Sequence, residues 1–198
     1  MKVVAFSDLH CDPECTNAIL AASGNADLVL GVGDFAQRHE GLEETLAALE
    51  PISEKTVLVP GNNETEDALR AATSATVLHG DAMSFCGLSI AGIGGAVPPL
   101  PPMPWRSFDV TEDEAETLLS EVSVADILLS HSPAKGHGDQ HHKMGSIGST
   151  AVLAATERLK PKWLLTGHVH DSWGYRGRVG STQVANLGPV PVYLEIAP

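Results

Sequence analysis

The sequence predicts an α/β fold in which two mixed sheets pack face to face and helices cover their outer faces. Short apolar runs alternate with helix-like segments, which is typical of layered sheets. Other runs, in the middle and near the C-terminus, follow one another across glycine turns and favour antiparallel strands. With 198 residues and 43% hydrophobic content, the chain is long enough for one well-cored domain and short for two. We therefore expect a single domain over residues 1–198.

Two kinds of apolar run predict the strands. Uninterrupted runs are typical of strands buried on both faces of a sheet; they cover residues 3–6, 28–31, 56–59, 127–129 and 163–165. Runs joined by glycine turns are typical of antiparallel strands; they cover residues 83–85, 88–91, 173–179, 183–186 and 192–196. Segment 92–108, rich in Gly and Pro, has no regular pattern and is interpreted as a substrate lid or a partner-docking surface around Trp105.

The helices are predicted from their caps and from apolar spacing. Asp12 and Pro13 have the form of an N-cap and a first-turn proline, and predict a helix over residues 14–22. Thr111 and Glu114 have the spacing of a capping box. Apolar residues at helical spacing support this helix and two others; they are Leu42, Leu46 and Leu49, then Ala115, Leu118, Leu119 and Val122, and finally Ile147, Ala151, Ala155 and Leu159.

Short polar clusters follow five of the strand-like runs, at the point where each run ends. They are Asp8-x-His10, Gly33-Asp34, Gly61-Asn62-Asn63-Glu64, Ser130-His131-Ser132 and Gly167-His168-Val169-His170. Strand ends that meet in one crevice can bring these side chains together. Carboxylate, imidazole and amide groups are the ligands that divalent metals need at a phosphoester-cleaving centre. Together the five clusters predict a two-metal hydrolytic site.

Each cluster also has a structural interpretation when it is taken alone. Asp8 and His10 would be a turn aspartate and a surface histidine, and a Gly-Asp pair is ordinary in turns. Glu64 suits the positive end of a following helix. His168 and His170, if their segment is extended, present their side chains to one face. Five clusters in one chain, each at a strand end, favour the metal site over these separate interpretations.

The order of the clusters resembles that of the calcineurin-like metallophosphoesterase family. The resemblance is especially close to small phosphoesterases related to a bacterial cyclic-nucleotide phosphodiesterase. Those proteins carry stretches similar to Ser130-His131-Ser132-Pro133 and Gly145-Ser146-Ile147-Gly148-Ser149, followed by Gly-His-x-His. The likeness extends from Lys2 to about Pro189 and implies a four-layer αββα sandwich of two mixed sheets flanked by helices.

The resemblance also implies a role for each cluster residue. The expected ligands of the first metal are Asp8, His10 and His170, and those of the second are Asn62, His131 and His168. Asp34 is expected to bridge the two metals, and a hydroxide between them to attack the phosphorus. The expected catalytic residues are Asp34, Asn63 and His131. This ligand set favours Mn(II), with Fe, Zn, Ni and Co as alternatives.

The residue after Asn62 departs from the family pattern. Many members have a histidine there that is thought to protonate the leaving group or hold the phosphate, whereas this chain has Asn63. An amide supplies no proton near neutral pH, so alcohols of high pKa should leave slowly unless another acid substitutes. The candidate acids follow the fourth cluster, near Lys135 and Lys143; they are His137, His141 and His142. A solvated, disordered turn is the alternative interpretation of this loop.

The net charge of the chain disfavours one class of substrate. A net charge of −13, from 12 Lys plus Arg against 25 Asp plus Glu, provides no basic stripe for a long nucleic acid. We expect a metal-dependent phosphodiesterase or phosphatase acting on a small phosphoester, such as a nucleotide or cyclic nucleotide. The alternatives are a nuclease on short nucleic-acid ends and a non-catalytic metal-binding interaction module. The oligomeric state, a homodimer included, stays open.

The cysteines and the hydropathy pattern bear on localisation. Cys11, Cys15 and Cys86 are an odd number without the spacing of a disulfide framework, which suits a reducing compartment. The first strand-like run begins almost at Met1 and leaves no room for a signal peptide, and no apolar run approaches the ~20 residues of a membrane span. We expect a soluble, cytoplasmic protein with no membrane partner.

Overall fold

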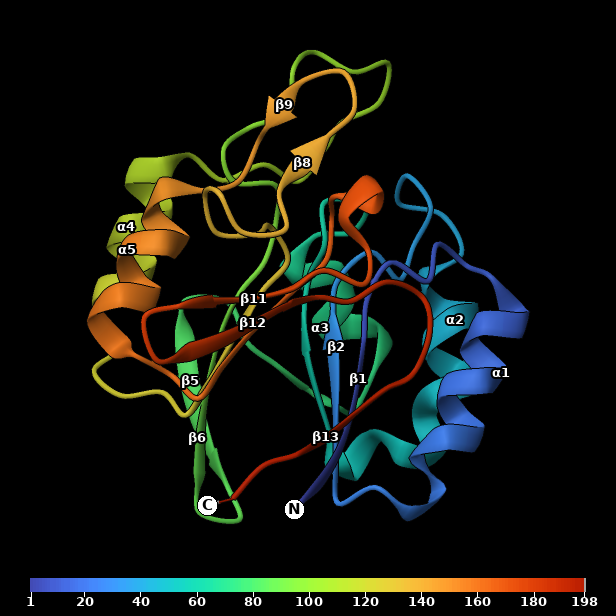
Figure 1. Cartoon of the computed structure of the whole chain (residues 1–198). Coiled ribbons are helices and arrows are strands. Elements are labelled where there is room, and N and C mark those ends of the chain that lie inside the picture. The colour runs from blue at the N-terminus through green and yellow to red at the C-terminus, as the bar shows by residue number, and fades with distance from the viewer. Residues whose placement is uncertain (198) are drawn as a thin grey trace.

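The structure, a computed structural model, describes residues 1–197 and contains two mixed sheets that pack against each other (Figure 1). The first sheet has the strand order β13-β1-β2-β3-β4. Within it, β1 (Lys2–Phe6), β2 (Leu28–Val32), β3 (Thr56–Val59) and β4 (Thr76–Val77) are parallel. The remaining strand, β13 (Val192–Glu195), runs antiparallel beside β1.

The second sheet has the strand order β11-β12-β10-β7-β6-β5. Its central strands are parallel; they are β12 (Thr182–Asn186), β10 (Trp163–Thr166), β7 (Ile127–Ser130) and β6 (Leu88–Ile93). Its edges, β11 (Arg176–Val179) and β5 (Asp81–Phe85), are antiparallel to their neighbours. A separate small hairpin, formed by β8 (Gln140–His141) and β9 (Gly145–Ser146), stands at one end of the molecule (Figure 1).

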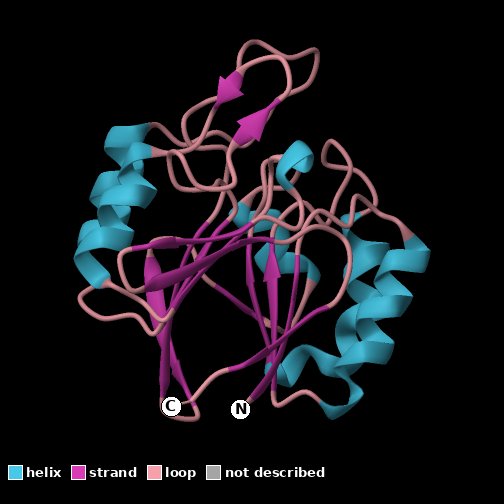
Figure 2. Ribbon diagram, viewed as in Figure 1, coloured by secondary structure: helices cyan, strands magenta, loops and turns pink. Residues whose placement is uncertain are grey.

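Helices form the two outer layers, with the strands between them (Figure 2). The helices α1 (Pro13–Ala22), α2 (Leu42–Leu49) and α3 (Glu66–Ala72) belong to the half of the chain that builds the first sheet. The helices α4 (Glu112–Ser120) and α5 (Thr150–Leu159) lie together beside the second sheet. Short 3-10 turns are η1 (Ser23–Asn25), η2 (Glu50–Lys55) and η3 (His170–Ser172).

Alternation along the strands explains the four layers. In β1, Val3 and Ala5 lie in a core cluster shared by both sheets, whereas Val4 and Phe6 lie in the cluster that includes residues of α1 and α2. A further cluster joins the second sheet to α4 and α5. Successive side chains of a strand point to opposite faces, so each buried strand contributes to two cores. The predicted αββα sandwich of two mixed sheets flanked by helices is confirmed.

Two predicted helix starts are confirmed by their hydrogen bonds, and a third helix begins later than expected. The Asp12 side chain accepts from the N–H groups of Glu14 and Cys15, and Thr111 and Glu114 make both hydrogen bonds of a capping box. The helix expected from Ile147 begins instead at Thr150. Its N-cap is Ser149, whose hydroxyl accepts from the N–H of Val152 and fixes this start.

The three C-terminal runs form strands with antiparallel neighbours, as predicted, but the last of them pairs with the first sheet rather than with the run before it. β11 and β12 do pair antiparallel, with the strand beginning at Arg176 rather than at Trp173. After β12 the chain crosses to the first sheet, where Leu194 pairs with Val3. This pairing covers the edge of β1, which would otherwise expose unpaired backbone groups.

The fold brings the carboxyl ends of strands from both sheets to one end of the molecule, next to β8 and β9 (Figure 1). β1, β2 and β3 contribute the loops that begin after Phe6, Val32 and Val59, and β7 and β10 contribute those after Ser130 and Thr166. These are the loops that carry the five polar clusters. Within residues 1–197, no helix has the length and apolar composition that crossing a bilayer would need.

Candidate metal centre

Three of the five polar clusters lie on tight, strained turns that follow strands. Asp8, His10, Asp34 and His168 all have positive φ angles, of 55°, 45°, 57° and 67°. Residues other than glycine rarely adopt positive φ angles, and such backbone strain is concentrated at functional sites. Two of the turns also bind each other, because the N–H of Asp8 donates to the carbonyl of Gly33 at 2.9 Å. The fold therefore fixes these side chains in place.

Asp34 lies at the middle of the cluster. Its Oδ2 is 3.6 Å from Nε2 of His10, and its Oδ1 is 3.4 Å from Nε2 of His131. Asn63 holds the carboxylate from the other side, since its backbone N–H donates to Oδ1 at 2.8 Å and its side-chain NH₂ to Oδ2 at 2.7 Å. The side chain of Asp34 is 4% exposed. Its two oxygens thus face two different groups of expected ligands.

The first group consists of Asp8, His10 and His170. The Nε2 atoms of His10 and His170 are 3.2 Å apart, and Oδ1 of Asp8 is 3.8 Å from Nε2 of His170. One atom from each of these three residues lies close enough to the others to hold a single ion. Asp8 is buried, whereas the side chain of His170 is 49% exposed.

The second group consists of Asn62, His131 and His168. Oδ1 of Asn62 is 3.2 Å from Nε2 of His131 and 2.9 Å from Nδ1 of His168. Nδ1 of His131 donates to the carbonyl of Val32 at 2.8 Å. This bond leaves Nε2 of the neutral imidazole with its lone pair, aimed at Asn62 and Asp34.

The donor set and its spacing fit divalent metals. Metal–ligand bonds of about 2.0 to 2.2 Å place neighbouring ligand atoms about 3 to 3.5 Å apart, and the contacts between imidazole nitrogens and oxygens described above span 2.9–3.8 Å. Each imidazole nitrogen can exchange a proton for a metal. The structure therefore brings together all seven residues predicted as ligands: Asp8, His10, Asp34, Asn62, His131, His168 and His170.

The way in which His168 and His170 reach the site differs from the prediction. The Gly-His-x-His segment was expected to be extended, so that alternate side chains share one face. Instead His168 has a φ of 67° and His170 begins η3. The N–H of His168 lies 3.1 Å and 3.2 Å from the two carboxylate oxygens of Asp8. This contact turns the segment so that one imidazole reaches each group.

The charges of the site shift its titration. Burial would raise the pKa of Asp34, but the imidazoles of His131, His10 and His168 outweigh burial and lower it. Burial would lower the pKa of His131, but the carboxylates of Asp34 and Asp8 outweigh it and raise the pKa from its ordinary value. Burial, reinforced by the charge of His131, lowers the pKa of His168 to about 3. His168 is therefore neutral near pH 7, whereas His131 holds a proton more tightly than an ordinary imidazole does.

We expect a metal at His131 to compete with a proton for Nε2. A metal at Nε2 of His131 must displace that proton, so metal affinity should weaken as the pH falls through the raised pKa of His131. Calorimetric titration of the metal-free protein in two buffers of different ionisation enthalpy would measure the protons released. Equal heats in both buffers would mean that His131 binds metal without losing a proton.

Glu64 belongs to the site in a way that the sequence did not indicate. It is fully buried, and its carboxylate accepts from the N–H groups of Asp34 at 2.8 Å, Gly61 at 2.7 Å and Ala36 at 3.0 Å. Burial and the charge of Asp34 raise the pKa of Glu64 to about 7. Its interpretation as a helix-end charge was wrong, because α3 begins two residues later with Thr65 as its cap. Glu64 ties the loop after β2 to the loop after β3.

Asn63 is buried and cannot act as an acid. Besides its two bonds to Asp34, its Oδ1 accepts from the N–H of Arg38 at 2.8 Å. Each polar atom of the side chain therefore has a partner. The contacts hold the carboxylate of Asp34 in place.

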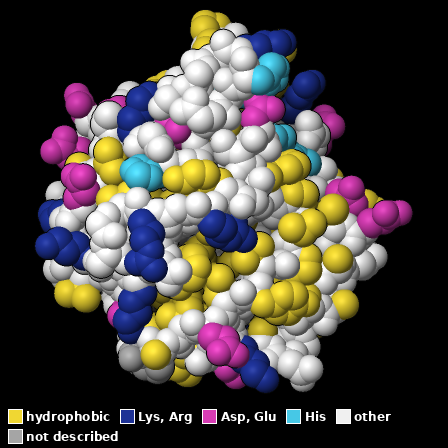
Figure 3. All heavy atoms as spheres, viewed as in Figure 1, with side chains coloured by type: hydrophobic (Ala, Val, Ile, Leu, Met, Phe, Trp, Pro, Cys, Tyr) yellow, Lys and Arg dark blue, Asp and Glu magenta, His cyan; other side chains and the backbone are white. Residues whose placement is uncertain are grey.

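The loop proposed to supply a substitute acid is an ordered hairpin rather than a disordered turn. The buried carboxylate of Asp139 accepts from the N–H groups of Gly136 and Gly148, and β8 is bound to η3 through Gln140 and Ser172. At its tip, Nδ1 of His142 lies 2.6 Å from Asp171, and the rings of His141 and His142 stack. Exposed histidine side chains appear towards this end of the molecule (Figure 3).

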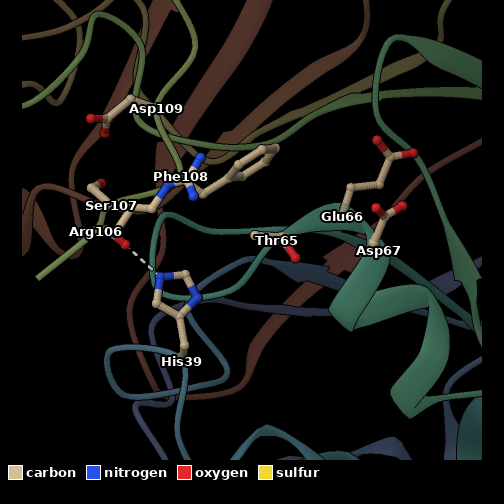
Figure 4. Close-up of a pocket in the computed structure, with 8 residues that line it drawn as sticks. All are labelled: His39, Thr65, Glu66, Asp67, Arg106, Ser107, Phe108 and Asp109. Atoms are coloured by element: carbon tan, nitrogen blue, oxygen red, sulfur yellow. Dashed lines mark hydrogen bonds between the residues drawn. The ribbon is translucent and has the colours of Figure 1, made fainter.

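A cavity of about 610 Å³ adjoins the Asn62–Asn63 loop. Its walls come from the loop at His39, the start of α3 and the end of segment 92–108 (Figure 4). His39 and Phe108 join it to the metal-centre loop, since their N–H groups donate to the carbonyls of Asn63 and Asn62. The imidazole of His39 contacts the carbonyl of Arg106. This cavity is large enough to receive part of a small-molecule ligand.

The fold and the converging ligands define an αββα sandwich with a candidate metal centre at one end. A family model described as "Calcineurin-like phosphoesterase" matches residues 1–172. The chain therefore belongs to the calcineurin-like phosphoesterase family, as the order of the clusters implied.

Individual relatives are more distant. The UPF0046 protein K07C11.7 of Caenorhabditis elegans is 25% identical over 198 aligned residues, which cover 88% of this chain. The alignment spans 65% of that relative's length. Among solved structures, TT1561 of Thermus thermophilus has a TM-score of 0.72 at 17% identity, covering 94% of this chain and 88% of that one. Phosphopantetheinyl hydrolase from Mycobacterium tuberculosis has a TM-score of 0.66 at 14% identity, covering 95% and 90%. These two structures share the fold.

Proposed function

We propose that this protein is a dinuclear metal-dependent phosphoesterase that hydrolyses a small phosphodiester or phosphomonoester. The observation that carries the proposal is the position of Asp34, whose Oδ2 faces His10 and whose Oδ1 faces His131. A carboxylate placed between two groups of ligands is suited to bridge two ions. Asp8, His10 and His170 would complete one metal position, and Asn62, His131 and His168 the other.

Two divalent ions bound there would supply a hydroxide nucleophile and would polarise the phosphoryl oxygens. The residues of the chain prepare the site for that chemistry. Asp34 holds the two positions together, and His131 presents Nε2 because Val32 accepts the hydrogen of Nδ1. Asn63 fixes the bridging carboxylate through two hydrogen bonds. Its contribution would be to position Asp34, and protonation of the leaving group would come from elsewhere.

The metal would be Mn(II), with Fe, Zn, Ni or Co able to replace it. Carboxylate and amide oxygens suit Mn(II), and imidazole nitrogens also suit the later first-row ions. The substrate would be small. The net charge of −13 disfavours a long nucleic acid, and the cavity at His39 and Phe108 could receive the organic group of an ester.

The test is hydrolysis of bis-p-nitrophenyl phosphate and p-nitrophenyl phosphate by metal-stripped protein, titrated with Mn(II). Diester turnover that appears with metal and saturates supports the proposal. Turnover of single-stranded oligonucleotides that collapses with salt would instead indicate a nuclease. Folded protein that binds metal but cleaves none of these esters would point to an interaction module.

Leaving-group dependence is the second expected result of that assay. Because Asn63 supplies no proton, aryl phosphodiesters with acidic phenols should react much faster than alkyl phosphodiesters. General acid catalysis is typically worth about 10²- to 10⁴-fold, and its absence should appear mainly with the alkyl esters. A series of phenyl and alkyl esters at fixed Mn(II) measures this. Similar rates across the series would mean that another residue donates the proton.

We also propose that residues 1–198 act as one catalytic domain in the cytoplasm. β13, near the C-terminus, completes the sheet that β1 begins. Cys11, Cys15 and Cys86 are free thiols, which suits a reducing compartment.

A further inference from the structure

Trp173 touches two expected ligands of the same metal from outside the cluster. Its indole N–H donates to Oδ2 of Asp8 at 3.1 Å. Its ring stacks on the imidazole of His170, with centroids 4.2 Å apart and planes inclined by 30°. The backbone at Gly188 backs the indole closely, because a Cβ added there would lie 3.0 Å from the Trp173 ring. The indole is thus held between the chain and the metal ligands.

The contact with Asp8 leaves one carboxylate oxygen for the metal. Oδ2 accepts from the Ser7 hydroxyl at 2.5 Å and from Trp173. The N–H of His168 lies between the two oxygens, 3.1 Å from Oδ1 and 3.2 Å from Oδ2. Oδ1 is the oxygen that faces His170, at 3.8 Å from its Nε2. A carboxylate whose second oxygen is occupied in this way binds metal through the first.

The contact with His170 replaces the usual support of a metal-binding histidine. Such residues generally donate their second ring N–H to a carboxylate or carbonyl, which fixes the ring. His131 has that support from Val32, whereas the protein atoms of residues 1–197 offer Nδ1 of His170 no hydrogen-bond partner. His170 is also 49% exposed, against 0% for His131. Stacking on Trp173 is what orients this exposed ring.

We propose that Trp173 is a positioning residue for the metal held by Asp8, His10 and His170, and that it sets the affinity of that metal separately from the other. The inference rests on the two-metal centre proposed above. The N–H of Trp173 selects the oxygen of Asp8, and its ring fixes His170. Within residues 1–197, no hydrogen bond or ring stacking joins the side chain of Trp173 to Asn62, His131 or His168. The position built from those three residues should therefore be affected little.

The test is metal titration of metal-stripped wild type, Trp173→Phe and Trp173→Ala, followed by calorimetry and by tryptophan fluorescence. Phenylalanine keeps a ring for stacking and loses the N–H, whereas alanine loses both. Removal of an outer partner of a metal ligand typically lowers metal affinity about 10- to 100-fold. We expect a loss of that size for one of two ions in Trp173→Ala and a smaller loss in Trp173→Phe, with the second ion bound as in wild type.

The chain offers matched controls in its other tryptophans, since Trp105 packs against His39 and Trp163 against the core between the sheets. Co(II) bound beside Trp173 should quench its emission. This quenching should persist in Trp105→Phe and Trp163→Phe and largely disappear in the Trp173 variants. Unfolding transitions recorded without metal show whether each variant is folded.

Three results would overturn the inference. They are wild-type affinity for both ions in Trp173→Ala, an equal loss for both ions, and quenching that survives without Trp173. Failure of the proposed function has a different signature. A wild type that binds two ions and cleaves no phosphoester would remove the function and leave the role of Trp173 intact, whereas a wild type that binds fewer than two ions would contradict both.

Discussion

Replacing Asp34 with asparagine should remove metal binding and turnover together. Asp34 is the carboxylate that faces both His10 and His131, so its loss weakens both metal positions. Its neutral amide would also place an NH₂ group against the donors of Asn63 that now bind the carboxylate. Even an outer partner of a ligand is worth about 10- to 100-fold in metal affinity, so a shared ligand should be worth more than about 100-fold. Metal content by elemental analysis and hydrolysis of bis-p-nitrophenyl phosphate would be measured on the same preparation.

Asp113→Asn is the matched control. It makes the same chemical change at an exposed position on α4, and should keep wild-type metal content and rate. The two-metal assignment would be wrong if Asp34→Asn retained near-normal activity. A variant that kept its metals but lost turnover would show instead that Asp34 acts in chemistry and contributes little to metal binding.

The second large effect is expected from substitution of Glu64. The loss of stability should depend on how many hydrogen bonds the new side chain keeps. Glu64→Ala leaves the buried N–H groups of Asp34, Gly61 and Ala36 without their acceptor. An unsatisfied buried donor costs about 1 to 3 kcal/mol, so the free energy of unfolding should fall by at least about 3 kcal/mol. Glu64→Gln can keep its oxygen on Asp34 and Gly61, and its NH₂ then opposes only Ala36. It should lose about 1 to 3 kcal/mol.

Urea unfolding of the metal-free proteins measures both losses. Glu66→Gln is a control two residues away, since Glu66 forms a helical ion pair with Arg70 of a kind worth about 0.3 to 0.5 kcal/mol. If Glu64→Ala were as stable as this control, the loops after β2 and β3 would not depend on the buried carboxylate. If it folded normally but lost metal, Glu64 would be a positioning residue only.

The convergence of the polar clusters could be predicted because each cluster is local in the sequence, whereas the assignment of each residue to a metal came from the family resemblance and stays a prediction. Each cluster directly follows an apolar run, and a strand end fixes where the next residues point. The four layers could be predicted for the same reason, since runs such as residues 3–6 and 127–129 are apolar throughout and require cover on both faces. Caps such as Asp12 and Thr111 depend on neighbours three residues away or fewer, and the sequence marks them directly.

The parts that the sequence did not predict depend on contacts between distant segments. Glu64 has no neighbouring residue that reveals its burial, because two of its three donors come from the loop about 30 residues earlier. The turn at His168 depends on Asp8, 160 residues away. The transfer of β13 to the first sheet depends on the open edge of β1 rather than on turn residues near 188. The local sequence pattern determines whether a segment forms a helix or a strand, whereas contacts between distant segments determine which strand it pairs with.

Both expected metal positions draw ligands from both sheets. Asp8 and His10 follow a strand of the first sheet and His170 a strand of the second; Asn62 follows the first, and His131 and His168 the second. An ion bound in either position would therefore link the two sheets of the sandwich. Binding of one ion would raise the free energy of unfolding by about 2.7 kcal/mol when the free ion is at 100 times its dissociation constant. By the same linkage, a substitution that destabilises the core shared by the sheets, at Leu30 or Leu129, can lower the apparent metal affinity although neither residue is a ligand.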